Sequence, residues 1–148
     1  MALPVERVQR AEELGYDIVW TAEAYGSDAV TPLAYLAAKT QRIRLGTAIC
    51  ILTQHDPINC AKAVASLDLI SNGRFEFGIG AGWNAEEMEN HGTKPSLRWK
   101  ILRERILANL EVGGAAEMDV YTTTVPGSYR PRLFSSASNP NSLHRELR

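Results

Sequence analysis

Three glycines alternate with other residues at the end of an apolar stretch, in the segment RFEFGIGAGWNAEE at residues 74–87. Gly78, Gly80 and Gly82 leave one side of the chain bare, which usually marks close approach by a ligand or by another backbone. A dinucleotide-binding G-x-G-x-x-G fingerprint would need a glycine at position 83, where the chain has Trp83. Two interpretations stay open. The glycines provide a flat surface for a planar ring, or they let a helix pack against the strand.

An acid, a thiol and an imidazole are candidates for chemistry elsewhere in the chain. Glu23 follows the apolar stretch YDIVWT, and its carboxylate could orient a substrate or move a proton. The alternative is a solvated acid, or one that helps to cap the next helix. Cys50 could be a nucleophile, but no histidine is evidently paired with it, which favours a small buried hydrophobic residue. His55 and His91 lie in predicted loops that could reach the same place.

The spacing of residues does not support a metal site, a serine nucleophile or a phosphate site. The chain has no H-x-x-x-H or C-x-x-C pair, so we expect no protein-bound metal. It has no G-x-S-x-G nucleophile elbow. Asn84 and Glu87 form an N-cap with an acid three residues later, and Glu86 adds a further negative charge. A helix start whose donors are already used in this way is a poor phosphate site.

Helical and strand-like segments alternate along the first 110 residues. The patterns predict helices at 4–14, from Thr31-Pro32 to about 39, at 56–70, at 84–90 and at 95–110, and strands at 16–23, 42–52 and 74–82. Such alternation is typical of parallel strands joined by helices, in a doubly wound sheet or a (β/α)8 barrel. Both folds place functional residues at the carboxyl ends of the strands, which here are residues 21–24, 49–52 and 80–84.

The composition limits the possible partners and the domain organisation. The chain of 148 residues is one domain or a piece of one, with a net charge near −1 and no basic stripe that would bind nucleic acid or a membrane surface. With no signal peptide or long apolar stretch, we expect a cytoplasmic protein, with Cys50 and Cys60 reduced. Residues 111–148 lose periodicity and are rich in Ser, Thr, Pro and Asn. We therefore predict a domain at 1–110 and a tail of low order at 111–148.

Residues 4–108 resemble the luciferase-like monooxygenase superfamily, and within it the branch that depends on the deazaflavin coenzyme F420. The resemblance is carried by AEELGYDIVWTAEAYGSDAVTPLAYLAAKTQRIRLGTAICIL, by DPINCAKAVASLDLISNGRFEFGIGAGWNAEEMENHG and by LRWKILRERILA. The family fold is a (β/α)8 barrel, so the resemblance implies a partial barrel with about strands two to four and helices one to four. It also implies that the glycine-rich strand end leaves room for a tricyclic cofactor.

The resemblance assigns expected roles to particular residues. Ile49, Cys50 and Ile51 fall where the family places a backbone bulge, often with a non-proline cis peptide, against the cofactor ring. Glu23 falls at the end of the second barrel strand, close to substrate and ring, and is the expected catalytic residue. Gly80, Ala81, Gly82 and Trp83 fall at the end of the fourth strand and are expected to contact the ring. Coenzyme F420 is the expected cofactor and FMN the alternative.

Three departures from the family pattern shape the functional expectation. The opening strand is absent, the chain leaves the pattern near residue 109, and the phosphate-gripping loops after strands seven and eight are missing. The change at 109 suggests a reading-frame change or a truncated gene copy. We expect a fragment of an oxidoreductase or monooxygenase that acts on a small organic substrate by hydride transfer or by oxygen activation. Little or no activity is expected of the fragment alone. Self-association through open barrel edges is expected. The alternatives are a non-catalytic remnant or assembly module, and a small doubly wound nucleotide-binding domain.

Overall fold

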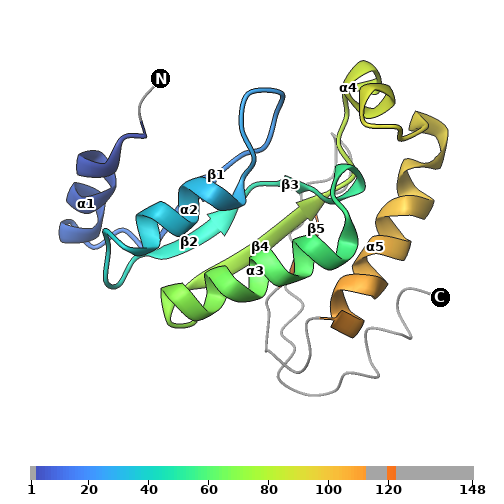
Figure 1. Ribbon diagram of the computed structural model, residues 1–148. Helices are drawn as coiled ribbons and strands as arrows, with labels where there is room; N and C mark the ends of the chain where they lie inside the picture. The colour runs from blue at the N-terminus through green and yellow to red at the C-terminus, as the bar shows by residue number, and fades with distance from the viewer. Residues whose placement is uncertain (1–2, 113–119, 123–148) are drawn as a thin grey trace.

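Helices and strands alternate along the chain as the sequence predicts. The computed structural model describes residues 3–112 and 120–122 (Figure 1). In chain order the elements are α1 (Val5–Glu13), β1 (Ile18–Thr21), α2 (Val30–Ala37), β2 (Arg44–Thr47), β3 (Cys50–Ile51), η1 (Leu52–Gln54), α3 (Pro57–Ser71), β4 (Phe75–Gly80), α4 (Ala85–Asn90), η2 (Pro95–Leu97), α5 (Arg98–Val112) and β5 (Val120–Thr122). Within these residues no helix is both long enough and apolar enough to cross a membrane.

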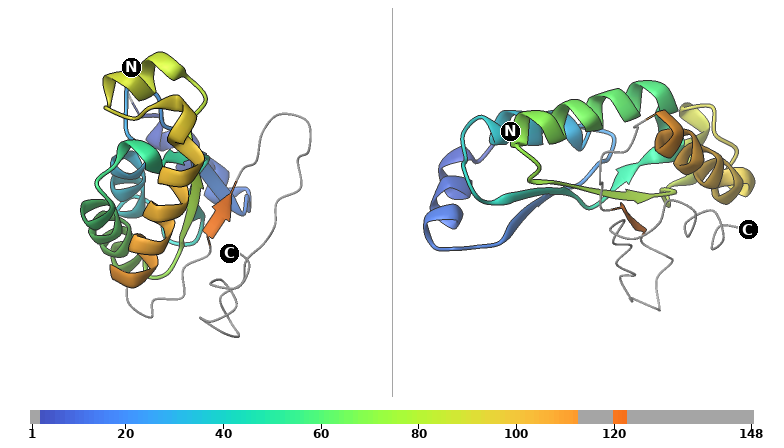
Figure 2. Two further views of the ribbon diagram at one scale, coloured as in Figure 1. Left: turned by 90° about the vertical axis from the view of Figure 1, so that its right-hand side faces the viewer. Right: turned by 90° about the horizontal axis from the view of Figure 1, so that it is seen from below.

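The strands form a parallel sheet, which confirms the predicted β/α organisation. Strand β1 pairs with β2, while β2 and β3 both pair with β4, and β5 also pairs with β4. Helices α2 and α3 lie side by side on one face of the sheet, and α5 packs against α3 (Figure 2). All six residues of β4 are buried, as expected for an interior strand of a parallel sheet.

The hydrophobic core lies between this sheet and the helices on its face. Leu33 and Leu36 of α2 and Val64 and Leu67 of α3 are almost completely buried. They belong to one cluster with strand residues such as Phe77. Burial of a side chain of this size contributes about 1.5–3 kcal/mol. The core therefore fixes the positions of the strand ends, where the predicted site lies.

Helix boundaries follow side-chain capping, and one predicted boundary is wrong. Asp56 caps α3 by accepting a hydrogen bond from the Asn59 N–H at 2.9 Å, and α3 ends at left-handed Asn72, as predicted. The start of α2 was predicted at Thr31-Pro32. Instead the Asp28 carboxylate accepts from the N–H groups of Val30 and Thr31, so the helix starts at Val30. An Asp three residues upstream replaces the predicted threonine cap.

The strand predicted at 42–52 is divided into β2 and β3. Leu45 pairs with Phe75 but Cys50 pairs with Ile79, so one extra residue lies between the two short strands. The peptide bond between Ala48 and Ile49 in this bulge is cis. The bulge therefore occurs in the segment for which the family resemblance implied one.

A half-buried arginine ties the amino-terminal end of the sheet to the helices. The Arg74 guanidinium donates to the carbonyls of Ser71, Ala37, Thr40 and Ile43 and to the Thr40 hydroxyl, at 2.7–3.3 Å. The planar group can satisfy several acceptors at once, which lysine cannot do. Arg74 thus joins the α3–β4 turn to the α2–β2 connection, at the end of the sheet opposite to the predicted site.

The predicted boundary at residue 110 and the tail of low order lie largely outside the described residues. Helix α5 continues to Val112, two residues beyond the predicted end. Strand β5 lies within the predicted tail, in the segment VYTTTV at residues 120–125, which is rich in β-branched residues. The predicted low order of 113–119 and 123–148 stays a prediction.

Candidate functional site

The predicted site residues lie at one edge of the sheet, where β1, β3 and β4 end. The Glu23 N–H donates to the Ile49 carbonyl at 3.2 Å, which joins the end of β1 to the bulge. Ile51 in turn pairs with Gly80 at the end of β4. Residues that are far apart in the sequence are thereby brought together at the carboxyl ends of parallel strands, where barrel enzymes carry their active sites.

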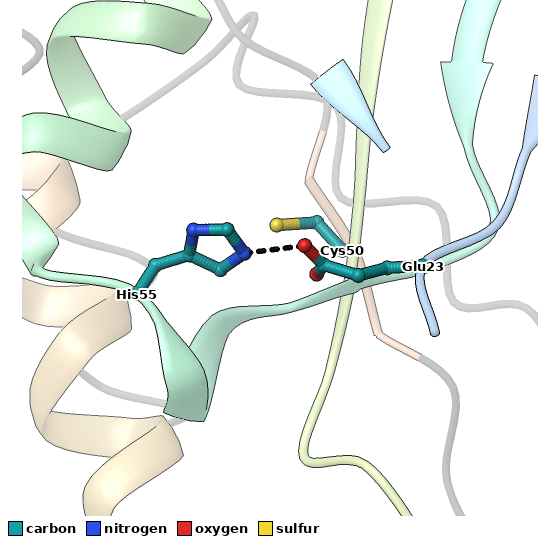
Figure 3. Close-up of side chains that lie close together, drawn as sticks. All are labelled: Glu23, Cys50 and His55. Atoms are coloured by element: carbon teal, nitrogen blue, oxygen red, sulfur yellow. Dashed lines mark hydrogen bonds and ion pairs between the residues drawn. The ribbon is translucent and has the colours of Figure 1, made fainter. Parts of the chain in front are cut away.

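A carboxylate, an imidazole and a thiol form the polar centre of this edge. Glu23 Oε1 lies 2.7 Å from His55 Nε2, and Glu23 Oε2 accepts the Ile51 N–H at 2.5 Å. The Cys50 sulfur points toward the gap between the other two side chains (Figure 3). One ligand atom from each of the three side chains lies within 4.8 Å of the other two. The sequence places His55 in a loop that could reach the edge, but does not predict its pairing with Glu23.

The centre is mostly shielded from solvent and open on the imidazole side. The Glu23 side chain is 7% exposed and that of His55 29% exposed, while Cys50 is completely buried. The Glu23 carboxylate raises the pKa of His55 through their hydrogen bond, and outweighs the opposing effect of burial. His55 can therefore hold a proton at this edge at a higher pH than a free histidine.

Cys50 is held as a neutral thiol by its surroundings. The pKa of Cys50 is raised by its hydrogen bond with the Cys60 thiol, by burial and by the nearby Glu23 carboxylate. A thiolate would be the nucleophile. In this protonation state Cys50 fits the buried-hydrophobic interpretation better than the nucleophilic one.

The residues expected to contact a ring differ widely in exposure. Trp83 is 85% exposed, while Cys50, Ile51 and Ala81 are buried at 4% exposure or less. Ile49 is partly exposed. The edge thus combines buried residues with an aromatic ring, that of Trp83, which is accessible to solvent.

Two of the three alternating glycines are explained by contacts within the protein. A Cβ atom at Gly78 would lie 1.9 Å from the Thr47 carbonyl oxygen. At Gly82 a Cβ would lie 2.9 Å from an Ile51 methyl group, and φ is +77°. The close approach at Gly78 is made by another backbone, neither by a ring nor by a helix. Gly80 is buried in β4 beside Ile51, and its role toward a ring stays a prediction.

Hydrogen bonds that the sequence analysis did not predict hold the loops at this edge. The Thr53 hydroxyl donates to the Ala81 carbonyl, and the Thr93 hydroxyl donates to the Thr53 carbonyl, both at 2.9 Å. Arg105 of α5 donates to the carbonyls of Leu52 and His55. The arginine-bearing segment LRWKILRERILA is part of the family resemblance, and this was the available signal for Arg105.

A second feature of the surface lies at the opposite end of the sheet. A cavity of about 540 Å³ is lined by residues 12–17 and 42–44, between the end of α1 and the start of β2. In barrel folds this amino-terminal end contributes to stability, while chemistry occurs at the other end. Glu23, Cys50 and His55, which we call the Glu23 cluster, lie outside this cavity and form the candidate functional site.

Comparison with known proteins places these residues in a family context. A family model described as "Luciferase-like monooxygenase" matches residues 4–144. The chain is 51% identical over 75 residues, 51% of its length, to a Mycobacterium tuberculosis protein provisionally named a coenzyme F420-dependent oxidoreductase, of which it covers 22%. It is 31% identical over 156 residues, covering 93% of the chain, to the oxygenase component of a flavin-dependent trigonelline monooxygenase from Acinetobacter baylyi, of which it covers 43%.

The comparison of structures agrees with the parallel β/α architecture. The monooxygenase RslO1 from Streptomyces bottropensis superposes with a TM-score of 0.73 at 24% identity, over 93% of this chain and 42% of that one. The architecture is thus part of the (β/α)8 barrel that the resemblance implied. The chain spans less than half of the length of these relatives.

Proposed function

Because the chain belongs to the luciferase-like monooxygenase family, we propose that it acts in an oxidoreductase that uses a deazaflavin or flavin on a small organic substrate. One observation carries the proposal. The Glu23 carboxylate is held by His55 and by the Ile51 N–H at the carboxyl ends of the parallel strands. A charged group that is nearly buried and fixed at this edge is typical of a catalytic centre.

The residues of this edge fit the ring of such a cofactor better than its phosphate. Trp83 presents an exposed aromatic face, and Ile51 and Ala81 are buried at the same edge of the sheet. The first N–H groups of α4 are already bonded to the Asn84 side chain. Since charge-assisted phosphate contacts usually supply much of the affinity, we expect weak binding, in the high micromolar range.

The protein would supply orientation and a proton at this edge. A reduced deazaflavin supplies a hydride when bound, and a reduced FMN supplies oxygen activation. Glu23 is oriented through both of its oxygens, and its carboxylate raises the pKa of His55, so that His55 keeps a proton to a higher pH than a free histidine does. We propose Glu23 as the catalytic residue that contacts the substrate, with His55 as the residue that positions it and holds its proton.

Coenzyme F420 is the proposed cofactor, with FMN as the alternative. The relative at 51% identity carries an F420-dependent name, whereas the flavin-dependent relative is 31% identical. The greater identity favours the deazaflavin. With either cofactor, the cofactor would perform the redox step and the protein would position it.

A fluorescence titration with each oxidised cofactor tests the proposal. We expect saturable quenching of the deazaflavin by the full chain, with weaker quenching of FMN. Trp83→Ala should weaken binding by roughly 2- to 12-fold, the value of about 0.5–1.5 kcal/mol for an aromatic contact. Trp99→Ala is the matched control, since Trp99 lies on α5 at 44% exposure beside Arg98. Absence of binding by both cofactors would instead support a non-catalytic module.

A further inference from the structure

The Glu23 cluster contains a thiol in addition to the carboxylate and the imidazole that could hold a proton. His55 and Glu23 alone would suffice to hold a proton, yet the Cys50 sulfur is directed at the same gap (Figure 3). The three ligand atoms, a carboxylate oxygen, an imidazole nitrogen and a sulfur, lie within 4.8 Å of one another. Donor atoms around one tetrahedral ion at bond lengths of about 2.0–2.3 Å are separated by distances below this limit.

From this geometry we propose that Glu23, Cys50 and His55 form a binding site for a zinc-like divalent metal ion. Sulfur, imidazole and carboxylate ligands together suit borderline-soft Zn²⁺ rather than Ca²⁺ or Mg²⁺. Three protein ligands leave a fourth position for water, which is the arrangement of zinc sites that can take part in chemistry. The proposal concerns the chain with no cofactor bound. While the ion is bound, Glu23 and His55 are its ligands and do not hold the proton assigned to them in the proposed function.

The groups around the ligands are already arranged to support such an ion. The Ile51 N–H holds Glu23 Oε2, so Oε1 is left facing His55 Nε2. Arg105 fixes the backbone of the His55 loop through the Leu52 and His55 carbonyls. Such outer hydrogen bonds orient metal ligands and typically change the affinity by about 10- to 100-fold when lost. The 29% exposure of His55 gives the ion a route of entry.

Charge compensation gives a reason for the buried thiol to accept a metal. A Cys50 thiolate beside the Glu23 carboxylate would place two negative charges in a shielded site, and burial disfavours this without a cation. A divalent ion would balance both charges, while His55 binds as the neutral imidazole. On binding, the Cys50 S–H proton and any proton on His55 are released to solvent, and no oxidation or reduction occurs.

The three ligands leave no motif in the sequence. Glu23 precedes Cys50 by more than twenty residues, and His55 lies on the loop between η1 and α3. The search for H-x-x-x-H and C-x-x-C pairs, on which the expectation of no metal rested, detects only ligands that are neighbours in sequence. The fold alone brings these three together.

Titration of the chelator-washed full chain with Co²⁺ tests this site in the absence of any cofactor. We expect about one equivalent to bind, with a thiolate-to-cobalt charge-transfer band, and Zn²⁺ to displace it. Cys50→Ser should abolish the band and weaken binding by at least about 100-fold, since a ligand is worth more than its outer hydrogen bonds. His55→Gln should weaken binding by a similar factor. His91→Gln is the matched control and should keep the band, because His91 is exposed at the end of α4.

Circular dichroism and thermal unfolding establish whether each variant is folded. If Cys50→Ser does not fold, the titration of the wild-type chain still tests the proposal. The proposal is overturned if the wild-type chain binds no stoichiometric Co²⁺, or if its band survives Cys50→Ser. It is also overturned if binding is unchanged in His55→Gln. Failure here would leave the cofactor proposal intact, because that proposal is measured by cofactor fluorescence.

Discussion

Replacing Gly78 by alanine should lower the free energy of unfolding more than the same replacement at Gly26, a glycine with free space around it. The added Cβ would lie 1.9 Å from the Thr47 carbonyl oxygen and 3.1 Å from its carbon. An ordinary C···O approach is about 3.3–3.6 Å, so β4 and the end of β2 would have to separate. Both contacted atoms are backbone, and a rotamer change cannot relieve the clash.

The magnitude follows from two contributions. Overpacking a filled interior costs about 1–3 kcal/mol. Separation of the strands also weakens the bond that the Thr47 hydroxyl donates to the Gly78 carbonyl at 2.7 Å, worth about 0.5–1.5 kcal/mol. We therefore expect Gly78→Ala to lower the free energy of unfolding by about 2–4 kcal/mol.

Urea unfolding followed by circular dichroism measures this loss, with Gly26→Ala as the matched control. A Cβ at Gly26 would meet nothing within 4 Å, and its φ is not in the left-handed range. That variant should change the free energy of unfolding by less than about 1 kcal/mol. If Gly78→Ala is as stable as Gly26→Ala, the close approach of the two strands is not what requires glycine here.

Three further predictions concern stability. Glu12 accepts hydrogen bonds from the N–H groups of residues 41–43, and these bonds lower its pKa despite the opposing effect of burial. The contribution of Glu12 to the free energy of unfolding is therefore fully present above the unfolded pKa of about 4.3. This contribution is lost as the pH falls through the lower pKa of the folded protein. Glu12→Gln should flatten this part of the pH profile of urea unfolding. Arg74→Lys should cost about 2–3 kcal/mol by losing several carbonyl bonds, whereas Arg7→Lys on the exposed face of α1 should be neutral, as thermal unfolding would show. Asp56→Ala should cost about 1 kcal/mol in the same assay by removing the α3 cap, and an unchanged midpoint would contradict that assignment.

The sequence predicts those parts of the fold that depend on neighbouring residues. Asp56-Pro57 and Asn72-Gly73 mark the ends of α3 because a cap and a left-handed turn are local chemistry. The start of α2 was misplaced because two local caps compete, and Asp28 reaches the N–H groups before Thr31 does. The sequence pattern alone does not show which of two nearby capping residues binds the N–H groups.

Features that depend on distant strands could not be predicted from the residues alone. The division of the 42–52 strand is a change of register against β4, where Leu45 pairs with Phe75 but Cys50 pairs with Ile79. Here the family resemblance provided what periodicity could not, since it implied a bulge at 49–51. The pairing of Glu23 with His55 spans 32 residues and leaves no spacing pattern. The edge of the sheet was thus predictable from alternation, but its polar centre was not.

The most direct test of the proposed function is to map where the cofactor ring binds. The ¹⁵N-labelled full chain would be titrated with the deazaflavin and with FMN while its backbone amide signals are followed. We predict saturable shifts of the amides of residues 49–51 and 80–83 together, at high micromolar cofactor. Shifts confined to residues 12–17 and 42–44, around the cavity at the opposite end of the sheet, or no shifts at all, would contradict the account.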